Sequence, residues 1–161
     1  MLKINKKVEY ALMALKFMAD KSQEHIEGDA PLISAREVCD KFNTPFDTTA
    51  KVMQIMNNQD LLKSTKGIKG GYSLNKDLSL VSYMNLVEMI EGKIAGSVCI
   101  SNKGTCELIG KCNITTPVEL LNKKMNAFLE SLTLADLLHG VEFNPEHKNA
   151  FMQMNSTEKT V

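Results

Sequence analysis

Residues 34–74, SAREVCDKFNTPFDTTAKVMQIMNNQDLLKSTKGIKGGYSL, decide the fold. Ser34 can cap a short helix, and the apolar residues that follow recur at i, i+3, i+4 and i+7, which is one helical face. Residues 44–47, Thr-Pro-Phe-Asp, then begin a second helix. Thr44 is its expected N-cap, Pro45 fits the first helical position, and Asp47 suits the positive helix end. Two short helices joined by a tight turn indicate a helix-turn-helix.

The second helix is predicted to run to about Asn58 and to have two different faces. Its core face consists of Thr49, Val52, Met53 and Met56. Its outward face consists of Asp47, Thr48, Lys51, Gln54 and Ile55. A recognition helix lies in the major groove with its N-terminal residues on base edges. Thr48 and Lys51 are therefore candidates to hydrogen-bond bases, and Gln54 can reach a base or a phosphate.

The next segment predicts a β-hairpin that would form the wing. Residues 62–66 fit a strand, residues 67–70 fit a glycine-bounded turn, and residues 71–74 fit a returning strand. The lysines of this hairpin and of the N-terminal segment form local positive clusters. Four of them are candidate phosphate contacts, namely Lys6, Lys7, Lys63 and Lys69. The expected fold is mainly α with a small β-hairpin, with a winged helix-turn-helix DNA-binding domain in residues 1–80.

Composition and the absence of known motifs exclude several classes of protein. The chain has 161 residues, a formal net charge of zero, 43% apolar residues and 24% charged residues. Overall charge gives no attraction to nucleic acid, so DNA affinity must come from local clusters. No stretch approaches 18 uninterrupted apolar residues and no signal-peptide pattern is present, so we expect a cytoplasmic protein without a membrane partner. No nucleotide-binding, metalloprotease or nucleophile motif occurs, so an enzyme is not expected.

The C-terminal half predicts a long helix that would make a dimer. Residues 116–119 read as a capping box with Pro117 at the first helical position. The apolar residues that follow have spacings of three and four, which form a coiled-coil-like seam. They are Val118, Leu121, Met125, Phe128 and Leu132. We expect a homodimer, with residues 81–140 carrying a cysteine loop and the dimerisation helix. Residues 141–161 are polar and aperiodic, which predicts a flexible tail.

Three cysteines lie in a polar segment without helical or strand periodicity, residues 93–115. Cys99 and Cys106 are separated by six residues, and Cys106 and Cys112 by five. Structural zinc sites usually use cysteines two to four residues apart, whereas wider spacing lets one loop wrap an iron–sulfur cluster. Free thiols and zinc remain the alternatives. Cys39 lies on an apolar helix face and is expected in the core.

These motifs together resemble the IscR/NsrR-type iron–sulfur winged-helix regulators. The resemblance covers about residues 2–140 and combines a Gly-Gly-Tyr wing with the cysteine trio. Its matching segments are Tyr10-Ala11-Leu12, Lys66 to Tyr72, the three cysteines and Thr133 to Leu137. The family implies a homodimer that binds double-stranded DNA at a palindromic operator. It also implies an iron–sulfur cluster, of which we favour 4Fe–4S over 2Fe–2S.

The resemblance also implies residue roles. Glu9 matches the acidic residue that, in the NsrR branch, reaches the cluster from the partner chain as its fourth ligand. The IscR branch uses a His three residues after the third cysteine, and Thr115 stands there in this chain. The first cysteine spacing is one residue longer than the commoner one. At the DNA-reading positions of the family this chain has Pro45, Thr48 and Lys51, and Lys66 stands where the wing enters the minor groove.

The expected function is a DNA-binding transcriptional regulator, a repressor, switched by a cluster that reports iron, nitric oxide or redox state. Its expected ligands are Cys99, Cys106, Cys112 and Glu9. One alternative is a thiol- or zinc-based sensor on the same fold. Another is a winged-helix protein-interaction module without a cluster.

Overall fold

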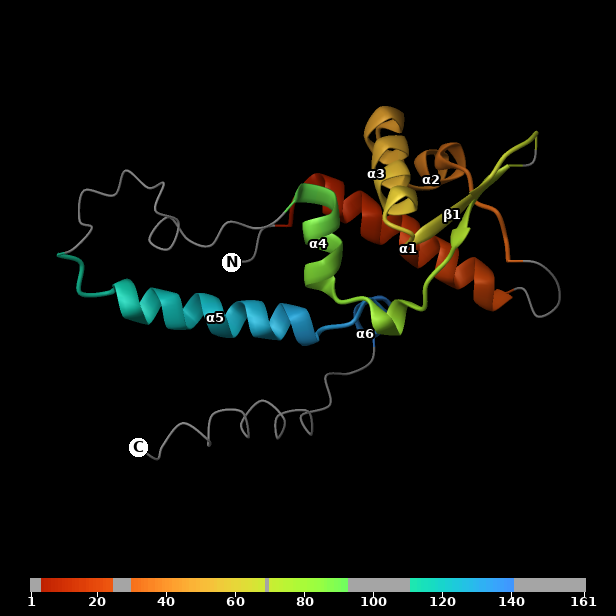
Figure 1. Cartoon of the computed structure of the whole chain (residues 1–161). Helices are drawn as coiled ribbons and strands as arrows, with labels where there is room; N and C mark the ends of the chain where they lie inside the picture. The colour runs from red at the N-terminus through yellow and green to blue at the C-terminus, as the bar shows by residue number, and fades with distance from the viewer. Residues whose placement is uncertain (1–3, 25–29, 69, 93–110, 141–161) are drawn as a thin grey trace.

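The computed structural model describes residues 4–24, 30–68, 70–92 and 111–140. Predictions for Lys69, Cys99, Cys106 and the tail at 141–161 therefore lie outside the described residues. A mainly helical body carries one two-stranded antiparallel hairpin and one long projecting helix (Figure 1). Its elements are α1 (Lys6–Glu24), α2 (Ala35–Phe42), α3 (Phe46–Asn58), β1 (Leu62–Thr65), β2 (Gly71–Leu74), η1 (Leu78–Leu80), α4 (Tyr83–Glu91), α5 (Thr115–Ser131) and α6 (Leu134–His139). The expected winged helix-turn-helix is confirmed.

Helix α1 runs through the middle of the body and contacts α2, α3, α4 and β2. The side chain of Asn5 caps it by accepting a hydrogen bond from the backbone N–H of Lys7 at 3.0 Å. Its inward face is fully buried and includes Val8, Leu15 and Met18. Each such apolar side chain contributes roughly 1.5–3 kcal/mol on leaving water. Burial of α1 therefore holds the surrounding helices in place.

The two helices of the helix-turn-helix begin in different ways. Ser34 and Glu37 form a complete capping box at α2. The expected cap at α3 is wrong, because Pro45 is the N-cap and no side chain caps this helix. The hydroxyl of Thr44 instead accepts a hydrogen bond from the buried hydroxyl of Thr49 at 2.9 Å. This bond satisfies a polar group that would otherwise be buried without a partner.

The wing is fixed to the body by backbone pairing. Strand β2 pairs with β1 and also forms a bridge from Tyr72 to Ile33, with two N–H···O bonds of 2.8 Å. Gly71 allows this close approach, because a Cβ atom there would lie 2.9–3.1 Å from the backbone atoms of Ile33. Gly70 has the same requirement, since its Cβ would lie 2.4 Å from the Thr65 carbonyl oxygen. The Gly-Gly pair is therefore a steric necessity of the hairpin.

Helices α4 and α6 join the winged body to α5. Ser82 caps α4 and Thr133 caps α6, each by accepting a hydrogen bond from a backbone N–H three residues later. The backbone N–H of Tyr83 donates to the carbonyl of Leu132, and that of Leu134 donates to Val81, both at 2.8 Å. These bonds attach the end of α5 to the start of α4.

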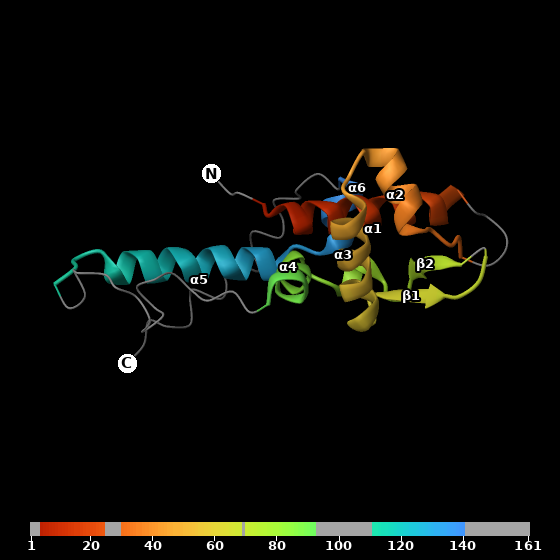
Figure 2. The same ribbon diagram turned by 90° about the horizontal axis from the view of Figure 1, so that it is seen from above.

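Helix α5 projects from the body in both views (Figures 1 and 2). It begins at Thr115 with Ile114 as N-cap and no side-chain cap, so the expected capping box at residues 116–119 is wrong. The helix starts earlier because the carbonyl of Ile114 already accepts from the Val118 N–H at 3.0 Å. Pro117 is tolerated there because backbone N–H groups of the first turn have no helical partner. No residue of α5 is fully buried, and Leu120, Leu121, Met125 and Phe128 are 40–60% exposed.

No helix within the described ranges is long and apolar enough to cross a membrane.

We predict that Gly71→Ala destabilises the protein by about 1–3 kcal/mol, because its new methyl group would collide with the Ile33 backbone. The measurement is the thermal unfolding midpoint, with Ser73→Ala in the same strand as the control. An unchanged midpoint for Gly71→Ala would contradict the steric argument.

Candidate nucleic-acid interface and cysteine segment

The outward face of α3 is available for contact with DNA. Lys51 and Gln54 are exposed and Thr48 is half-buried, while Thr49, Val52, Met53 and Met56 are buried as expected. Pro45 is exposed immediately before the helix. The predicted base-reading residues therefore lie along one face of α3 and just before it. Burial of the opposite face of α3 in the core keeps this face directed to solvent.

Helix α1 adds a lysine to this surface. A pocket of about 220 Å³ lies between α1 and α3. Its lining residues are Lys7, Asp47, Thr48, Lys51, Val52 and Ile55. The structure thus brings Lys7 beside Thr48 and Lys51, although more than forty positions separate them in the sequence. Two lysines around one depression favour a phosphate, and Asp47 favours a base-edge donor such as a cytosine amine.

The hairpin tip lies on the same side of the molecule as the start of α3 (Figure 1). In Figure 1 the N-terminal end of α3 and the tip of the hairpin both lie along the upper edge. Lys63 and Lys66 are exposed, and Ile68 at the tip is fully exposed. Together these elements form a surface on which a helix and a hairpin can meet adjacent grooves of a duplex.

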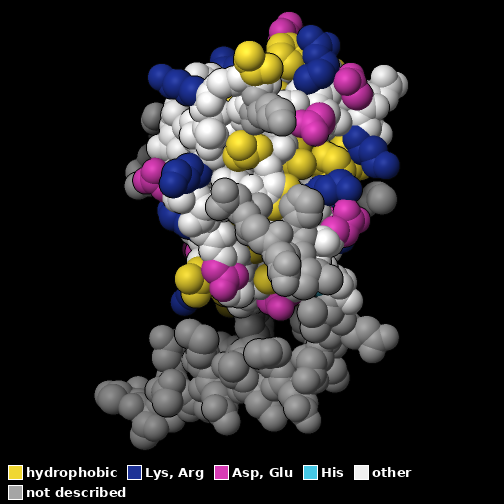
Figure 3. Space-filling model, turned by 90° about the vertical axis from the view of Figure 1, so that its right-hand side faces the viewer, with side chains coloured by type: hydrophobic (Ala, Val, Ile, Leu, Met, Phe, Trp, Pro, Cys, Tyr) yellow, Lys and Arg dark blue, Asp and Glu magenta, His cyan; other side chains and the backbone are white. Residues whose placement is uncertain are grey.

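Charge on the molecular surface is mixed. On the described part of the face that Figure 3 shows, Lys and Arg side chains alternate with acidic and apolar ones. Lys6 is 2.5 Å from the Glu9 carboxylate, and this hydrogen bond and charge raise the pKa of Lys6 above its usual value. Lys6 is therefore protonated in the folded protein at neutral pH, and the carboxylate of Glu9 partly compensates its positive charge.

The helix-turn-helix contains a cation that the sequence argument missed. The guanidinium carbon of Arg36 lies 4.6 Å from the centre of the Phe46 ring, so the stacked pair joins the start of α2 to the start of α3. Arg36 is the chain's single arginine, against many lysines. A single arginine among many lysines could have marked Arg36 as a functional candidate. Its stacking on Phe46 could not be predicted, because it depends on how α2 and α3 cross.

Cys112 is the one member of the cysteine trio among the described residues. It is half-buried just before α5 and has no disulfide partner in the described ranges. Hydrogen bonds from the Ile114 backbone and the Thr115 side chain hold the pKa of its thiol below the usual value. The thiolate is the form that binds metals, so Cys112 has the chemistry of a ligand. Cys39 is 7% exposed and belongs to the core, as expected.

Glu9 lies in the first turn of α1 and is half-buried, with its carboxylate on Lys6. The start of α1 and the start of α5 are well separated in both Figure 1 and Figure 2. One chain therefore does not bring Glu9 to Cys112. Among the described residues no three ligand side chains gather closely enough to hold a metal, and the other two cysteines fall outside these residues.

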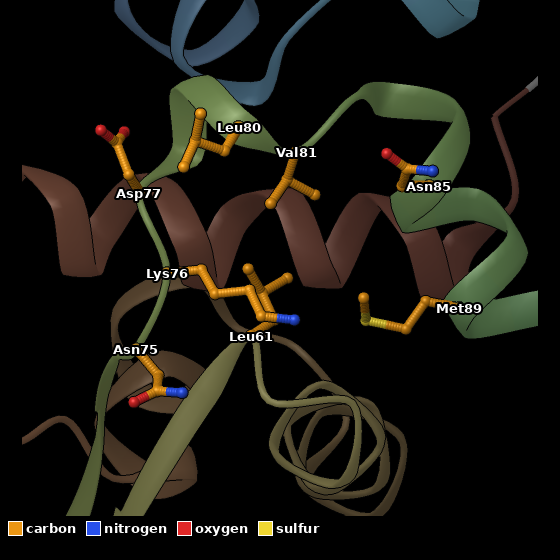
Figure 4. A pocket seen from close by; sticks show the side chains of 8 residues that line it. All are labelled: Leu61, Asn75, Lys76, Asp77, Leu80, Val81, Asn85 and Met89. Carbon is orange, nitrogen blue, oxygen red and sulfur yellow. The ribbon is translucent and has the colours of Figure 1, made fainter.

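A second pocket, of about 440 Å³, shows no catalytic arrangement (Figure 4). It is lined by Leu61, Asn75, Lys76, Asp77, Leu80, Val81, Asn85 and Met89. Its polar side chains already serve the local fold, since Lys76 donates to the Gln59 carbonyl and Asn75 to that of Asp60. The Asp77 carboxylate accepts from the Ser79 N–H, and this bond lowers the pKa of Asp77.

Comparisons with known proteins agree with this arrangement. Residues 4–140 match the family model of Rrf2, described as an iron-dependent transcriptional regulator. An rrf2-like HTH-type regulator of Rhodobacter capsulatus is 29% identical over 141 residues, which are 84% of this chain and 91% of that protein. The HTH-type transcriptional regulator IscR of Yersinia pseudotuberculosis is 23% identical over 159 residues, covering 99% of this chain and 91% of IscR.

Two solved structures share the fold. CymR of B. subtilis, described as the global cysteine regulator, superposes with a TM-score of 0.64 at 22% identity, covering 88% of this chain and all of CymR. The IscR of T. potens superposes with a TM-score of 0.62 at 21% identity, covering 88% and 89%. The fold, the outward recognition helix and the match over residues 4–140 lead to one conclusion: this chain belongs to the Rrf2 family of transcriptional regulators and is not an enzyme.

Proposed function

We propose that this protein is a cytoplasmic, homodimeric repressor that reads a palindromic operator and is switched by an iron–sulfur cluster. The observation that carries the proposal is the exposed outer face of α3, beside Lys7 of α1, in a chain that also has three cysteines just before α5 in the sequence. Residues 1–80 would read DNA, and residues 81–140 would hold the cluster and the second protomer. The family's description as iron-dependent supports an iron cofactor.

The exposed apolar side of α5 supports the dimer. Leu120, Leu121 and Met125 are 42–60% exposed on a helix that projects from the body. Large apolar side chains grouped on one surface mark interaction sites, because water contact with them is unfavourable. Packing α5 against a second copy would bury this seam.

The ligands we propose are Cys99, Cys106, Cys112 and Glu9 of the partner subunit. The depressed pKa of Cys112 fits a thiolate ligand of iron. The Lys6 contact does not prevent Glu9 from acting, because an exposed ion pair contributes little stability. When bound, a 4Fe–4S or 2Fe–2S cluster would supply iron that reacts with nitric oxide and oxidants.

The chain itself can transmit this state to DNA. Helix α1 carries Glu9 and packs directly on α3. A link between the start of α5 and the partner's α1 would therefore fix the separation of the two recognition helices. Half-site spacing on an operator depends on that separation. Loss of the link would change operator affinity, which is a coupling between two distinct sites.

The DNA contacts we propose are Pro45, Thr48, Lys51 and Gln54 on or beside α3, Lys63, Lys66 and Lys69 on the wing, and Lys6 and Lys7 on α1. The α3 residues would reach base edges. Lys66 would enter the minor groove, and the remaining lysines would contact phosphates.

The first test is the visible spectrum, with iron and sulfide content, of protein purified without oxygen. We expect broad visible absorbance in the unmodified chain and its loss in Cys106→Ala, because a thiolate ligand is removed. Cys39→Ala is the matched control and should keep the colour, since Cys39 belongs to the core. Zinc or no metal in the unmodified chain, even after reconstitution, would favour the thiol- or zinc-based sensor instead.

The contribution of Glu9 across the dimer has its own test. A heterodimer of one Glu9→Ala chain and one Cys106→Ala chain contains one intact site if Glu9 acts in trans, and none if it acts within its own chain. We expect this heterodimer, isolated through two different tags, to hold about half of the normal iron in a site as resistant to oxygen as the unmodified one. The Glu9→Ala homodimer should be more sensitive. If the heterodimer and the Glu9→Ala homodimer are equally sensitive to oxygen, the trans arrangement is contradicted.

For DNA reading, we expect Lys51→Met to weaken binding about tenfold to a duplex selected from a random pool by the unmodified protein, because a base-edge donor is lost. Fluorescence anisotropy measures the affinity. Lys21→Met is the control, since Lys21 pairs with Glu24 at the opposite end of α1. If both variants bind equally well, α3 does not read DNA as proposed.

A further inference from the structure

The stacked pair of Arg36 and Phe46 lies at the edge of the proposed reading surface. Arg36 is the second residue of α2, and Phe46 is the first residue of α3. We propose that Arg36 clamps a DNA phosphate beside the major groove and that Phe46 positions its guanidinium for this contact. The proposal rests on the DNA-reading role of α3 and adds a contact that sets where this helix enters the groove.

The geometry leaves the guanidinium ready for a ligand. Its carbon lies 4.6 Å from the Phe46 ring centre, and both residues are exposed. A cation over an aromatic face is held in place electrostatically. The edge of the planar group keeps its N–H donors free, and this fork matches two phosphate oxygens. Phe46 thus orders the side chain without occupying its hydrogen-bond donors.

No carboxylate in the described ranges neutralises Arg36. The ion pairs found there join lysines of α1 to acidic residues of the same helix. Glu37, the neighbouring acid, accepts the backbone N–H of Ser34 at 2.6 Å. Asp40 lies one turn further along α2 and forms no ion pair with Arg36. Arg36 is exposed and makes no ion pair within the described part of the chain, so its charge is available to an anion.

The position of Arg36 in its helix also favours an anionic partner. A cation in the first turn meets the positive end of the helix dipole, which is unfavourable in the free protein. A phosphate at the same place would be attracted both by the dipole and by the guanidinium. Arg36 therefore gains its favourable charge contact when DNA is bound, and the free fold depends little on it.

The test uses the full-length chain purified without oxygen and two duplexes of equal length. One duplex is selected from a random pool by the unmodified protein, and the other has an arbitrary sequence. We expect Arg36→Met to weaken binding to both about tenfold and to reduce the slope of log affinity against log salt by about one. The unfolding midpoint should change little. Lys41→Met is the matched control, because Lys41 is an exposed cation at the other end of α2. This variant should keep the DNA affinity and the salt slope of the unmodified chain.

Two further variants separate positioning from bulk charge. Arg36→Lys should restore the salt slope but only part of the affinity, because a lysine lacks the planar fork. Phe46→Leu as a single substitution should weaken DNA binding. Added to Arg36→Met, it should cause no further loss of affinity. A further loss in the double variant would overturn the positioning role of Phe46.

The outcomes distinguish this contact from the proposed function. A loss confined to the selected duplex would place Arg36 on a base edge and overturn the phosphate assignment. A lowered unfolding midpoint with unchanged salt slope would assign Arg36 to the fold alone and overturn the proposal. Unchanged binding by Arg36→Met, with Lys51→Met impaired, would overturn this inference but leave the reading role of α3 standing. Absence of DNA binding by the unmodified chain would overturn both.

Discussion

The burial of α1 against α3 is the interaction on which the rest of the structure depends. Leu15 and Met18 of α1 and Met53 and Met56 of α3 are all within 1% of complete burial, in one continuous core. Because the inner face of α3 is fixed in this way, its outer face can only point to solvent. The same contact places Lys7 beside the outer face of α3. The stability of the core and the geometry of the proposed DNA-reading surface therefore come from the same packing.

The wing is held by a different and narrower constraint. Two backbone hydrogen bonds join Tyr72 to Ile33, and they require a glycine at position 71 because the two backbones nearly touch there. Ile33 immediately precedes the cap of α2. The hairpin and the helix-turn-helix are thus connected through a few backbone atoms. This connection fixes the direction of the wing relative to α3, which two grooves of one duplex would require.

The single chain leaves two features incomplete, and both concern α5. Its side chains Leu120, Leu121 and Met125 are exposed, and its start is far from the start of α1, where Glu9 lies (Figures 1 and 2). A second protomer would complete both features, because it would cover the apolar side chains of α5 and place its own α1, with Glu9, near the cysteines. Sensing and dimerisation would then share one helix, and the connection from α5 through α1 to α3 would carry a change at the cysteines to the DNA surface.

The sequence by itself determined the elements and the buried faces. The Ser34 capping box, the inward side of α3, the Gly-Gly hairpin and the α4 and α6 caps follow from spacings of three or four residues, so local physics decides them. Tertiary structure alone decided the pairings between distant positions. Arg36 of α2 meets Phe46 of α3, and Lys7 of α1 meets the outer face of α3. Such contacts depend on how helices cross, and the crossing is set by the shape of the whole core rather than by any local pattern.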